Sequence, residues 1–438
     1  MSLTCIALAV VLQGSPPRAD SRLSALLATA VDQANPKIRL ELAEALAKRE
    51  GVSEDQWLAA ARAFAPRPLE LGPGTHVTEV PLWDGEAEVR GEIVMHVPAS
   101  YDHEVPTALI LAMHGTGGDG NWMLGMWKDM AEATGCLLLC PTDTGPNVGF
   151  AATDVERQTT LSALRWARRS FNVDENALFL TGFSRGGHMT WDLGLRFPDM
   201  WAALCPMVGG PRFELARGAN NIRYFENLRG LPMVCMQGEL DQAGLVWSVK
   251  EVFARIRKAG IEAAELHLFP DLGHFVDMQA VDWPAFLALR RDPQPKRVVR
   301  TYARTGEGRR AWMEVTGASS KVEEIFTPKL RHSEVKRLGD EGLRRAIIDA
   351  SIKKTGRIDG RFIEPGSFRL ESQHVTKLRL LLTQDMLPKG DQKLEIKLGS
   401  TKRRFVIRRE SRVLLTDFVE RFDRSYLPLA EVRISLGR

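Results

Sequence analysis

The chain has 438 residues, of which 44% are hydrophobic and 26% charged, with a formal net charge of +4. This is an ordinary globular composition, and the length allows two or three domains or one large domain with an appendage. The apolar runs are too short to span a bilayer, which excludes a stable membrane span and leads us to expect a soluble mature chain.

The two parts of the chain carry charge of opposite sign. Residues 1–290 hold 25 Lys and Arg against 35 Asp and Glu, whereas residues 291–438 hold 34 against 20. A change of this size predicts a domain boundary near Arg290. The basic part either attracts a polyanion or forms a solvated surface that partly faces the acidic part.

A short apolar run, residues 5–12, lies near the N-terminus and is followed by Gln13-Gly14-Ser15-Pro16-Pro17. It is similar to the core of a secretory signal peptide, which predicts a signal peptide over 1–15 and export to the periplasm or the outside. No Lys or Arg precedes the run and no clean cleavage site follows, so a frayed N-terminus on a cytoplasmic protein is the alternative. The cysteines do not decide the compartment, because all but Cys5 fall in apolar strand-like runs where buried free thiols are the default.

Apolar residues at helical spacing predict helices over 21–64, within an N-terminal helical segment of residues 16–75. Two strands are predicted between 76 and 97. Strands and helices then alternate up to 290. The predicted strands are 107–113, 136–140, 176–181, 201–208, 232–237 and 264–269, and the predicted helices lie near 121–134, 152–171, 185–196, 243–259 and 277–290. Near-continuous apolar strands are typical of a parallel sheet covered on both faces, so the predicted fold class of residues 76–290 is α/β.

The pattern changes beyond residue 290. Strands are predicted at 300–303 and 311–315, a charged and partly helical stretch at 319–352, and well-alternating segments over 357–436. Alternation with polar outward positions predicts a small antiparallel β module, of the sandwich type, within a basic segment of residues 291–438.

The strongest local signal is Gly182-Phe183-Ser184-Arg185-Gly186, between the apolar run 177–181 and a helical pattern that begins near Arg185. A Gly-x-Ser-x-Gly between a strand and a helix is the sequence of a nucleophile elbow, a sharp turn that exposes the serine oxygen to a base. Serine is a weak nucleophile until a neighbouring base takes its proton. A chance match in a βα turn is the alternative.

The partners that such a serine needs follow in the chain. His274, in the loop after the strand at 264–269, is the candidate base, and His188 is a rival that we expect to lie inside the packing one helical turn from Ser184. Asp241, after the strand at 232–237, is the candidate acid that orients the base, with Glu239 and Asp271 as rivals. The order Ser184, Asp241, His274 is that of α/β hydrolases.

An oxyanion needs two backbone N–H donors. The candidates are Arg185, directly after the serine, and Thr116 or Gly117 in the loop His114-Gly115-Thr116-Gly117-Gly118. Gly115 and Arg185 are also candidate substrate-binding residues, because a glycine lets the backbone approach a ligand and a cation beside the nucleophile either binds an anionic group or pairs with a cap. No Lys-Ser/Thr follows the loop and no metal-ligand spacing occurs, so neither a nucleotide site nor a metal site is predicted.

These motifs, together with Arg196-Phe197-Pro198-Asp199 and Pro270-Asp271-Leu272-Gly273-His274-Phe275, resemble an α/β-hydrolase catalytic domain over residues 108–275. The resemblance is to polyhydroxybutyrate-depolymerase and feruloyl-esterase-like enzymes, which overlap with prolyl-oligopeptidase-like domains. The resemblance implies a serine hydrolase. In one respect the chain differs from these enzymes, because Arg185 stands where a small residue or Met is more usual. The N-terminal helices and the C-terminal module lie outside it.

Three functions follow as hypotheses. The first is hydrolysis of carboxylic esters, small or linked to a polysaccharide, through an acyl-enzyme on Ser184 without a cofactor. The second is a serine peptidase on the same fold, and the third is a non-catalytic scaffold whose basic module binds a polysaccharide or another anionic surface. Residues 209–230 are predicted to form a lid or pocket wall. We expect no nucleic-acid partner, and the sequence leaves the acyl group, the alcohol and the oligomeric state open.

Overall fold

The computed structural model describes residues 21–66, 71–143, 149–215, 218–388 and 393–436. The predicted signal peptide, residues 1–15, and Cys5 lie outside these ranges. Within them, no helix combines the length and the apolar character needed to cross a bilayer. The remaining cysteines are free and buried, as their apolar surroundings predicted: Cys136, Cys140, Cys205 and Cys235.

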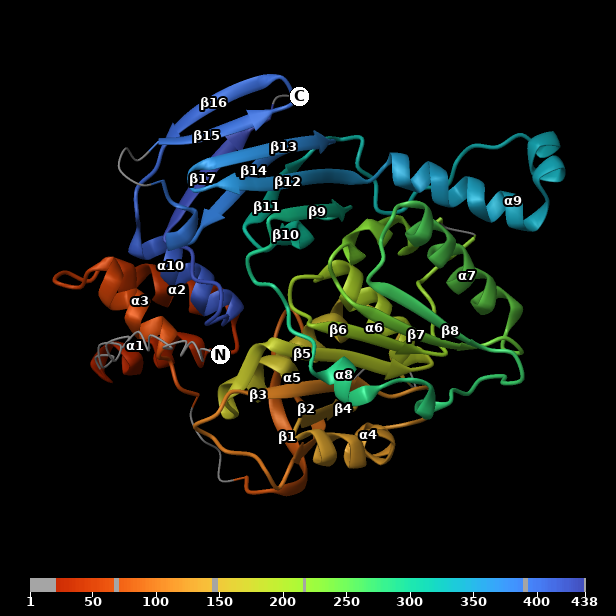
Figure 1. Cartoon of the computed structure of the whole chain (residues 1–438), viewed down its shortest axis with the longest axis horizontal. Coiled ribbons are helices and arrows are strands. Elements are labelled where there is room, and N and C mark those ends of the chain that lie inside the picture. Colours follow the sequence, from red (N-terminus) through yellow and green to blue (C-terminus); the bar gives the residue numbers. More distant parts are fainter. Residues whose placement is uncertain (1–20, 67–70, 144–148, 216–217, 389–392, 437–438) are drawn as a thin grey trace, which may run out of the picture.

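An eight-stranded sheet lies at the centre of the acidic part of the chain (Figure 1). Its strand order is β1-β2-β4-β3-β5-β6-β7-β8. The strands are β1 (Gly74–Trp83), β2 (Glu88–Val97), β3 (Thr107–Met113), β4 (Leu137–Pro141), β5 (Val173–Phe183), β6 (Ala203–Met207), β7 (Met233–Gly238) and β8 (Ala264–Phe269). The pairs β1·β2 and β2·β4 are antiparallel and the others are parallel. The predicted α/β fold with a mostly parallel sheet is confirmed.

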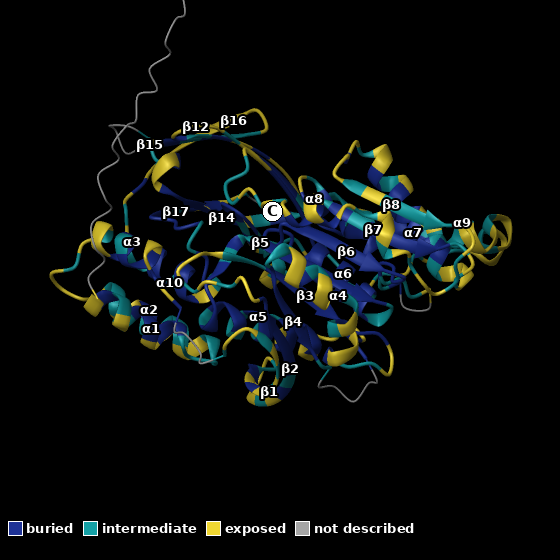
Figure 2. Cartoon of the chain, turned by 60° about the horizontal axis from the view of Figure 1, so that its bottom comes forward, coloured by how far each residue is buried: buried dark blue, intermediate teal, exposed yellow. Residues whose placement is uncertain are grey.

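Helices cover both faces of this sheet. The helices α5 (Asp154–Ser170), α6 (Arg185–Arg196) and α7 (Ala243–Lys258) pack on one face, and α4 (Gly120–Thr134) and α8 (Trp283–Leu287) pack on the other. Along β3, Leu109 and Leu111 face the first cluster, whereas Ile110 and Ala112 face the second. Both faces are therefore buried (Figure 2), which is why this strand is a continuous apolar run.

The helix predicted over 277–290 is shorter in the structure. A 3-10 turn spans Met278–Ala280, and α8 begins only at Trp283. Asp282 caps α8, and Pro284 stands in its first turn. A proline lacks the N–H that a continuous helix would need here, so the helix starts at this point instead of running through it.

The basic part contains two further sheets that pack face to face. One has the order β10-β11-β14-β17, and the other has the order β16-β15-β13-β12-β9. The strands are β9 (Arg297–Tyr302), β10 (Arg309–Arg310), β11 (Met313–Ala318), β12 (Gly356–Glu364), β13 (Ser367–Gln373), β14 (Val375–Leu382), β15 (Lys393–Leu398), β16 (Thr401–Val406) and β17 (Ala430–Ser435). Apolar side chains such as Leu380 and Ile396 form the core between the sheets. The pairing is antiparallel except between β13 and β15, which run parallel.

Two helices interrupt this β region. The first, α9 (His332–Lys353), packs beside α7 (Figure 1), as its ion pair between Asp349 and Arg255 at 2.7 Å shows. The second, α10 (Ser411–Arg421), shares a core with the N-terminal helices α1 (Ser21–Val31), α2 (Pro36–Ala47) and α3 (Glu54–Arg62). Arg165 and Arg168 of α5 donate hydrogen bonds to carbonyl groups at the C-terminal end of α10, which satisfies carbonyls that a helix end leaves unpaired. The N-terminal helices and α10, which lie far apart in the sequence, are thus joined on the side of α5.

Part of the positive charge beyond residue 290 faces the acidic part of the chain. Among the described residues, arginines of the basic segment pair with carboxylates of the acidic part: Arg304 with Asp154, Arg345 with Glu251, Arg357 with Glu226, Arg409 with Asp55, Arg421 with Asp199 and Arg424 with Glu175. The buried Arg300 donates to the carbonyl oxygens of Leu195 and Arg196 at the end of α6. These contacts favour the interpretation in which the basic segment is turned partly toward its acidic neighbour.

Candidate active site

Ser184 lies in the sharp turn between β5 and α6. Its backbone angles are φ 56° and ψ −113°, in a region that residues with a side chain seldom adopt. The turn leaves no room for side chains on its two glycines. A Cβ on Gly186 would lie 1.9 Å from the carbonyl oxygen of Met113, and a Cβ on Gly182 would lie 2.3 Å from that of Gly186. The two glycines of the Gly-x-Ser-x-Gly sequence are therefore required by the close backbone contacts around a strained serine.

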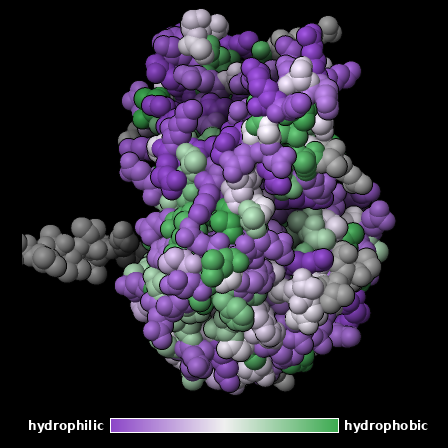
Figure 3. Space-filling view, turned by 90° about the vertical axis from the view of Figure 1, so that its right-hand side faces the viewer, coloured by the Kyte–Doolittle hydropathy of each residue, from purple (hydrophilic) through white to green (hydrophobic). Residues whose placement is uncertain are grey.

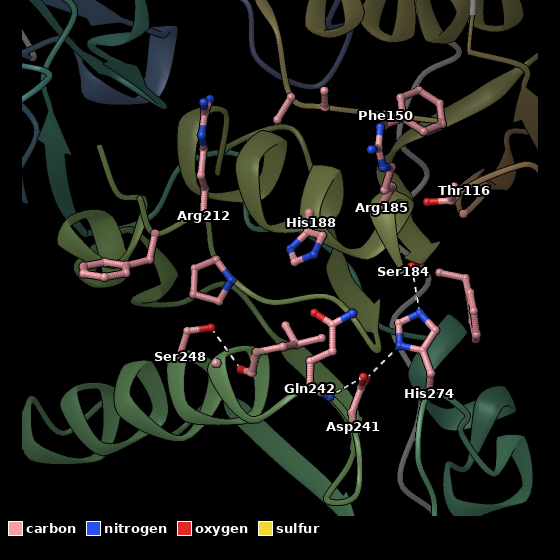
Figure 4. Close-up of a pocket in the computed structure, with 18 of the residues that line it drawn as sticks. Thr116, Phe150, Ser184, Arg185, His188, Arg212, Asp241, Gln242, Ser248 and His274 are labelled. Carbon is pink, nitrogen blue, oxygen red and sulfur yellow. Dashed lines mark hydrogen bonds and ion pairs between the residues drawn. The ribbon is translucent and has the colours of Figure 1, made fainter. Parts of the chain in front are cut away.

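The imidazole of His274 joins Ser184 to Asp241 (Figure 4). Its Nε2 lies 2.8 Å from the Ser184 Oγ, and its Nδ1 lies 2.8 Å from an Asp241 carboxylate oxygen. Because an ionised carboxylate only accepts hydrogen bonds, Nδ1 carries the proton and Nε2 is the acceptor that faces the serine hydroxyl. The structure thus brings together the three side chains that the sequence proposed as nucleophile, base and acid.

Asp241 is held as a carboxylate. Burial by itself would raise the pKa of Asp241, but hydrogen bonds from His274, from the backbone N–H of Gln242 and from the side chain of Gln237 outweigh this and hold that pKa below its ordinary value. The carboxylate is 3% exposed, whereas the His274 side chain is 43% exposed and open to a substrate. Gln237 was not among the predicted site residues, although it lies at the end of the strand that leads to Asp241.

None of the three rivals, His188, Glu239 and the exposed Asp271, takes part in the hydrogen bonds that link Ser184, His274 and Asp241. The carboxylate of Glu239 pairs with Lys250 at 2.5 Å. The ring of His188 is bonded through Nδ1 to the carbonyl oxygen of Gly210 at 2.6 Å and lines the cavity beside Ser184. Burial lowers the pKa of His188, which keeps this imidazole neutral near pH 7. His188 is therefore a half-buried wall residue of the cavity.

The glycine-rich loop after β3 runs along the serine. A Cβ on Gly115 would lie 3.1 Å from the Ser184 Cβ, so the backbone there is close enough to touch a bound ligand. Within the described part of the chain, the backbone N–H groups of Thr116 and Gly117 donate no hydrogen bond. Arg185 supplies the first N–H of α6, a donor without a partner inside the helix. These are the three backbone donors that the sequence suggested.

His114 holds this loop in place. Its Nε2 accepts a hydrogen bond from the backbone N–H of Asp143 at 2.9 Å, so its Nδ1 carries the proton that is donated to the carbonyl oxygen of Gly115 at 2.8 Å. The ring is 1% exposed and packs against Phe150. Sequence analysis treated His114 only as the first residue of the loop, and its position directly before the glycines is the signal that points to this role.

Arg185 points away from the serine toward Phe150 (Figure 4). Its Nη1 donates to the carbonyl oxygen of Gly149 at 3.0 Å, and it forms no ion pair with the described carboxylates. The sequence suggested two roles for Arg185, binding an anionic group or pairing with a cap. The described residues do not show the second role. The side chain lines the cavity and braces the backbone at Gly149.

A cavity of about 1340 Å³ opens over Ser184. Trp122, Phe150 and Phe183 lie on its wall near the serine. On another side the wall is built by residues 211–214, so part of the segment predicted as a lid or wall, residues 209–230, lines the cavity. Arg344 of α9 also lines it, although it belongs to the basic segment beyond the sheet. Within the described residues, no group of three or more His, Cys, Asp or Glu side chains is arranged to hold a metal ion.

The strand order, the elbow after β5 and the positions of Asp241 after β7 and of His274 after β8 define an α/β hydrolase. No family model matches the chain. Feruloyl esterase C from Emericella nidulans is 29% identical over 161 residues, which cover 35% of this chain and 59% of that protein. A probable feruloyl esterase C from Aspergillus terreus is 24% identical over 171 residues, 37% of this chain and 63% of that one.

The chain thus spans about three fifths of the length of these curated relatives. Among solved structures, a thermostable esterase superposes with a TM-score of 0.41 at 18% identity, covering 49% of this chain and 63% of that one. The resemblance to feruloyl esterases that the motifs suggested is also found in the sequence comparisons.

Proposed function

We propose that the chain is a serine carboxylic-ester hydrolase, with Ser184 as the nucleophile, His274 as the base and Asp241 as the residue that orients the base. The observation that carries this proposal is the unbroken pair of hydrogen bonds, each 2.8 Å long, from Asp241 through His274 to a strained serine on a cavity wall. A serine in that arrangement loses its proton as it attacks a carbonyl carbon.

Acylation begins when the Ser184 Oγ attacks the ester carbonyl while His274 Nε2 takes the hydroxyl proton. The imidazolium that forms is stabilised by the Asp241 carboxylate through Nδ1–H. His274 then returns the proton to the alcohol oxygen as the carbon–oxygen bond breaks, which releases the alcohol and leaves an acyl group on Ser184. Water attacks this acyl-enzyme with His274 again as the base, and the acid leaves with Ser184 restored.

The negative charge on the attacked carbonyl oxygen needs preorganised donors. We assign the backbone N–H of Arg185 and that of Thr116, with Gly117 as the alternative in the same loop. Each donor of this kind contributes on the order of 10²–10³ in kcat in well-studied hydrolases. His114 supports this assignment because it fixes the carbonyl group of Gly115 and thereby the direction of the loop.

The apolar wall favours an aromatic or alkyl substituent on the ester. The rings of Trp122 and Phe183 meet edge to face with their centroids 5.0 Å apart, and the Phe183 ring lies 5.5 Å from the His274 ring in the same manner. Offset and edge-to-face contacts of this kind favour an aromatic ligand beyond simple burial. The relatives are named as feruloyl esterases, and an aromatic acyl group is therefore the substituent that we propose for this chain.

The proposal is tested with 4-nitrophenyl esters of acetate, octanoate and ferulate on the wild type, Ser184→Ala and Ser248→Ala. Ser248 lines the same cavity, but its hydroxyl donates to the carbonyl oxygen of Leu245 and does not reach His274. We expect hydrolysis by the wild type and by Ser248→Ala, a fall in kcat of at least about 10⁴ in Ser184→Ala, and the highest kcat/KM for ferulate. Faster cleavage of peptide reporters than of every ester would point instead to a peptidase.

A further inference from the structure

One wall of the cavity comes from a helix outside the hydrolase sheet. Arg344 lies on α9, which is held against α7 by two ion pairs, Arg345 to Glu251 at 3.0 Å and Asp349 to Arg255 at 2.7 Å. A hydrogen bond between Ser351 and Asn220 ties the end of α9 to the segment next to the cavity wall. Arg344 is therefore carried on a helix fixed at several points.

The Arg344 guanidinium is oriented by aromatic rings. It lies 5.3 Å from the Trp247 ring centroid and 5.8 Å from that of Phe213, a cation–π arrangement that occupies the flat face of the group. Within the described residues, its N–H groups donate no hydrogen bond and form no ion pair. The edge of the guanidinium, which carries those donors, is thus available on a half-buried side chain that lines the cavity.

The charges on the cavity wall are unbalanced. Its described lining residues include three arginines, Arg185, Arg212 and Arg344, and two carboxylates, Glu214 and Asp241. Both carboxylates already have partners, since Glu214 pairs with Arg212 and Asp241 with His274. An anionic group that entered the cavity would meet positive charge that no described carboxylate neutralises. The molecular face on the side of α7 and α9 is mostly hydrophilic (Figure 3), as suits a polar ligand.

We propose that Arg344 determines specificity by binding a carboxylate that the ester substrate carries in addition to the ester group. The inference rests on the proposed hydrolase function. A guanidinium presents parallel N–H donors that match the two oxygens of a carboxylate, and the aromatic rings hold this fork in place before the substrate arrives. The favoured substrate is an acidic ester, with the carboxylate either on the acyl part or on the alcohol part.

Two pairs of esters distinguish these positions. Mono-4-nitrophenyl glutarate carries a carboxylate on the acyl chain, and 4-nitrophenyl valerate lacks it. In the second pair, 4-acetoxybenzoate carries a carboxylate on the leaving group, and its methyl ester lacks it. The quantity measured is the ratio of kcat/KM for the acidic ester to that for its neutral partner, in the wild type, Arg344→Gln, Arg344→Lys and Arg337→Gln. Arg337 is an exposed arginine of α9 that lies before the kink at Gly339 and does not line the cavity, so its variant removes an equal charge.

We expect the ratio for one of the two pairs to fall on the order of tenfold in Arg344→Gln, mainly through KM, because a hydrogen-bonded charge pair is lost. Arg344→Lys should keep part of the preference, and Arg337→Gln should keep all of it. Loss of packing in α9 would lower both rates of a pair together and leave the ratio unchanged. An unchanged ratio for both pairs in Arg344→Gln overturns the proposal, even when Ser184-dependent hydrolysis of the neutral esters shows that the proposed function holds.

Discussion

The backbone of Gly238 passes so close to the carbonyl oxygen of Gly273 that a Cβ on Gly238 would lie 1.9 Å from that oxygen. Gly238 ends β7 just before the loop that carries Asp241, and Gly273 directly precedes His274. This approach of two loops lets the carboxylate reach the imidazole at 2.8 Å. Their contact holds together the two loops that carry the acid and the base.

Replacing Gly238 by alanine should separate Asp241 from His274. The added methyl group must displace backbone, which costs about 1–3 kcal/mol of unfolding free energy and moves the acid away from the base. We expect kcat to fall at least about tenfold with a smaller change in KM, measured with an aryl ester. Gly273→Ala is the matched control, because a Cβ there has only the Leu240 carbonyl oxygen near it, at 3.9 Å. Equal losses in the two variants would contradict this account of the loop contact.

Asp241→Asn should leave the protein folded and nearly inactive. An amide in place of the carboxylate no longer fixes the proton on Nδ1 of His274, and in a serine protease the corresponding change lowers kcat about 10⁴-fold. Glu239→Gln changes the neighbouring carboxylate, which pairs with Lys250, and should retain activity. Steady-state kinetics with thermal unfolding as a folding check makes the comparison, and the reverse ranking would assign the acid to Glu239.

The buried carboxylate of Asp192 should be important for stability. It is 0% exposed and accepts hydrogen bonds from Arg157, Arg196 and Asn221, and Arg196 in turn pairs with Glu307 of the basic segment. Asp192→Asn leaves two arginines without their buried counter-charge, which we expect to cost about 3–5 kcal/mol in denaturant unfolding.

Asp154→Asn is the control for this prediction. Asp154 pairs with the same Arg157, but its side chain is 65% exposed, so its loss should cost less than about 1 kcal/mol. Similar losses for the two variants would show that burial of the ion pair does not matter here.

The same carboxylates should make the fold sensitive to acid. Burial alone would raise the pKa values of Asp192 and Asp199, but nearby arginines, chiefly Arg196 for Asp192 and Arg421 for Asp199, outweigh burial and hold both pKa values below the ordinary range. A lowered pKa in the folded state means that the unfolded chain binds protons first. The contribution to stability is therefore full above about pH 4 and decreases as the pH falls below it. Tm measured between pH 6 and pH 3 should drop steeply at the acid end and less steeply in Asp192→Asn. If the Tm of Asp192→Asn fell with pH as steeply as that of the wild type, Asp192 would not be a source of the acid sensitivity.

Much of the structure of residues 76–290 could be predicted because the sequence patterns that indicate it are local. A continuous apolar strand, a Gly-x-Ser-x-Gly turn and polar residues just after strand ends are each contained in a few residues, and their order along the chain indicates which loops meet. The α/β fold and the group Ser184, Asp241 and His274 could be proposed from that order. His188 was expected inside the packing, but it is half-buried and lies on the cavity wall, with its ring bonded to the carbonyl oxygen of Gly210.

The contribution of the basic segment could not be predicted in the same way. The charged stretch 319–352 shows a partly helical pattern, but nothing in it tells which side chain turns toward a cavity formed by residues far away in the chain. That choice is made by the ion pairs between α9 and α7 and by the aromatic pair under Arg344. The shared core of α10 with the N-terminal helices likewise joins segments with no local signal of their contact.

The most direct test of the proposed nucleophile is covalent labelling by a fluorophosphonate probe, followed by intact-protein and peptide mass spectrometry. The account predicts one adduct per chain, located on the peptide that contains Ser184, absent in Ser184→Ala and retained in Ser248→Ala. No adduct on the folded wild type, or equal labelling of Ser184→Ala, would contradict it.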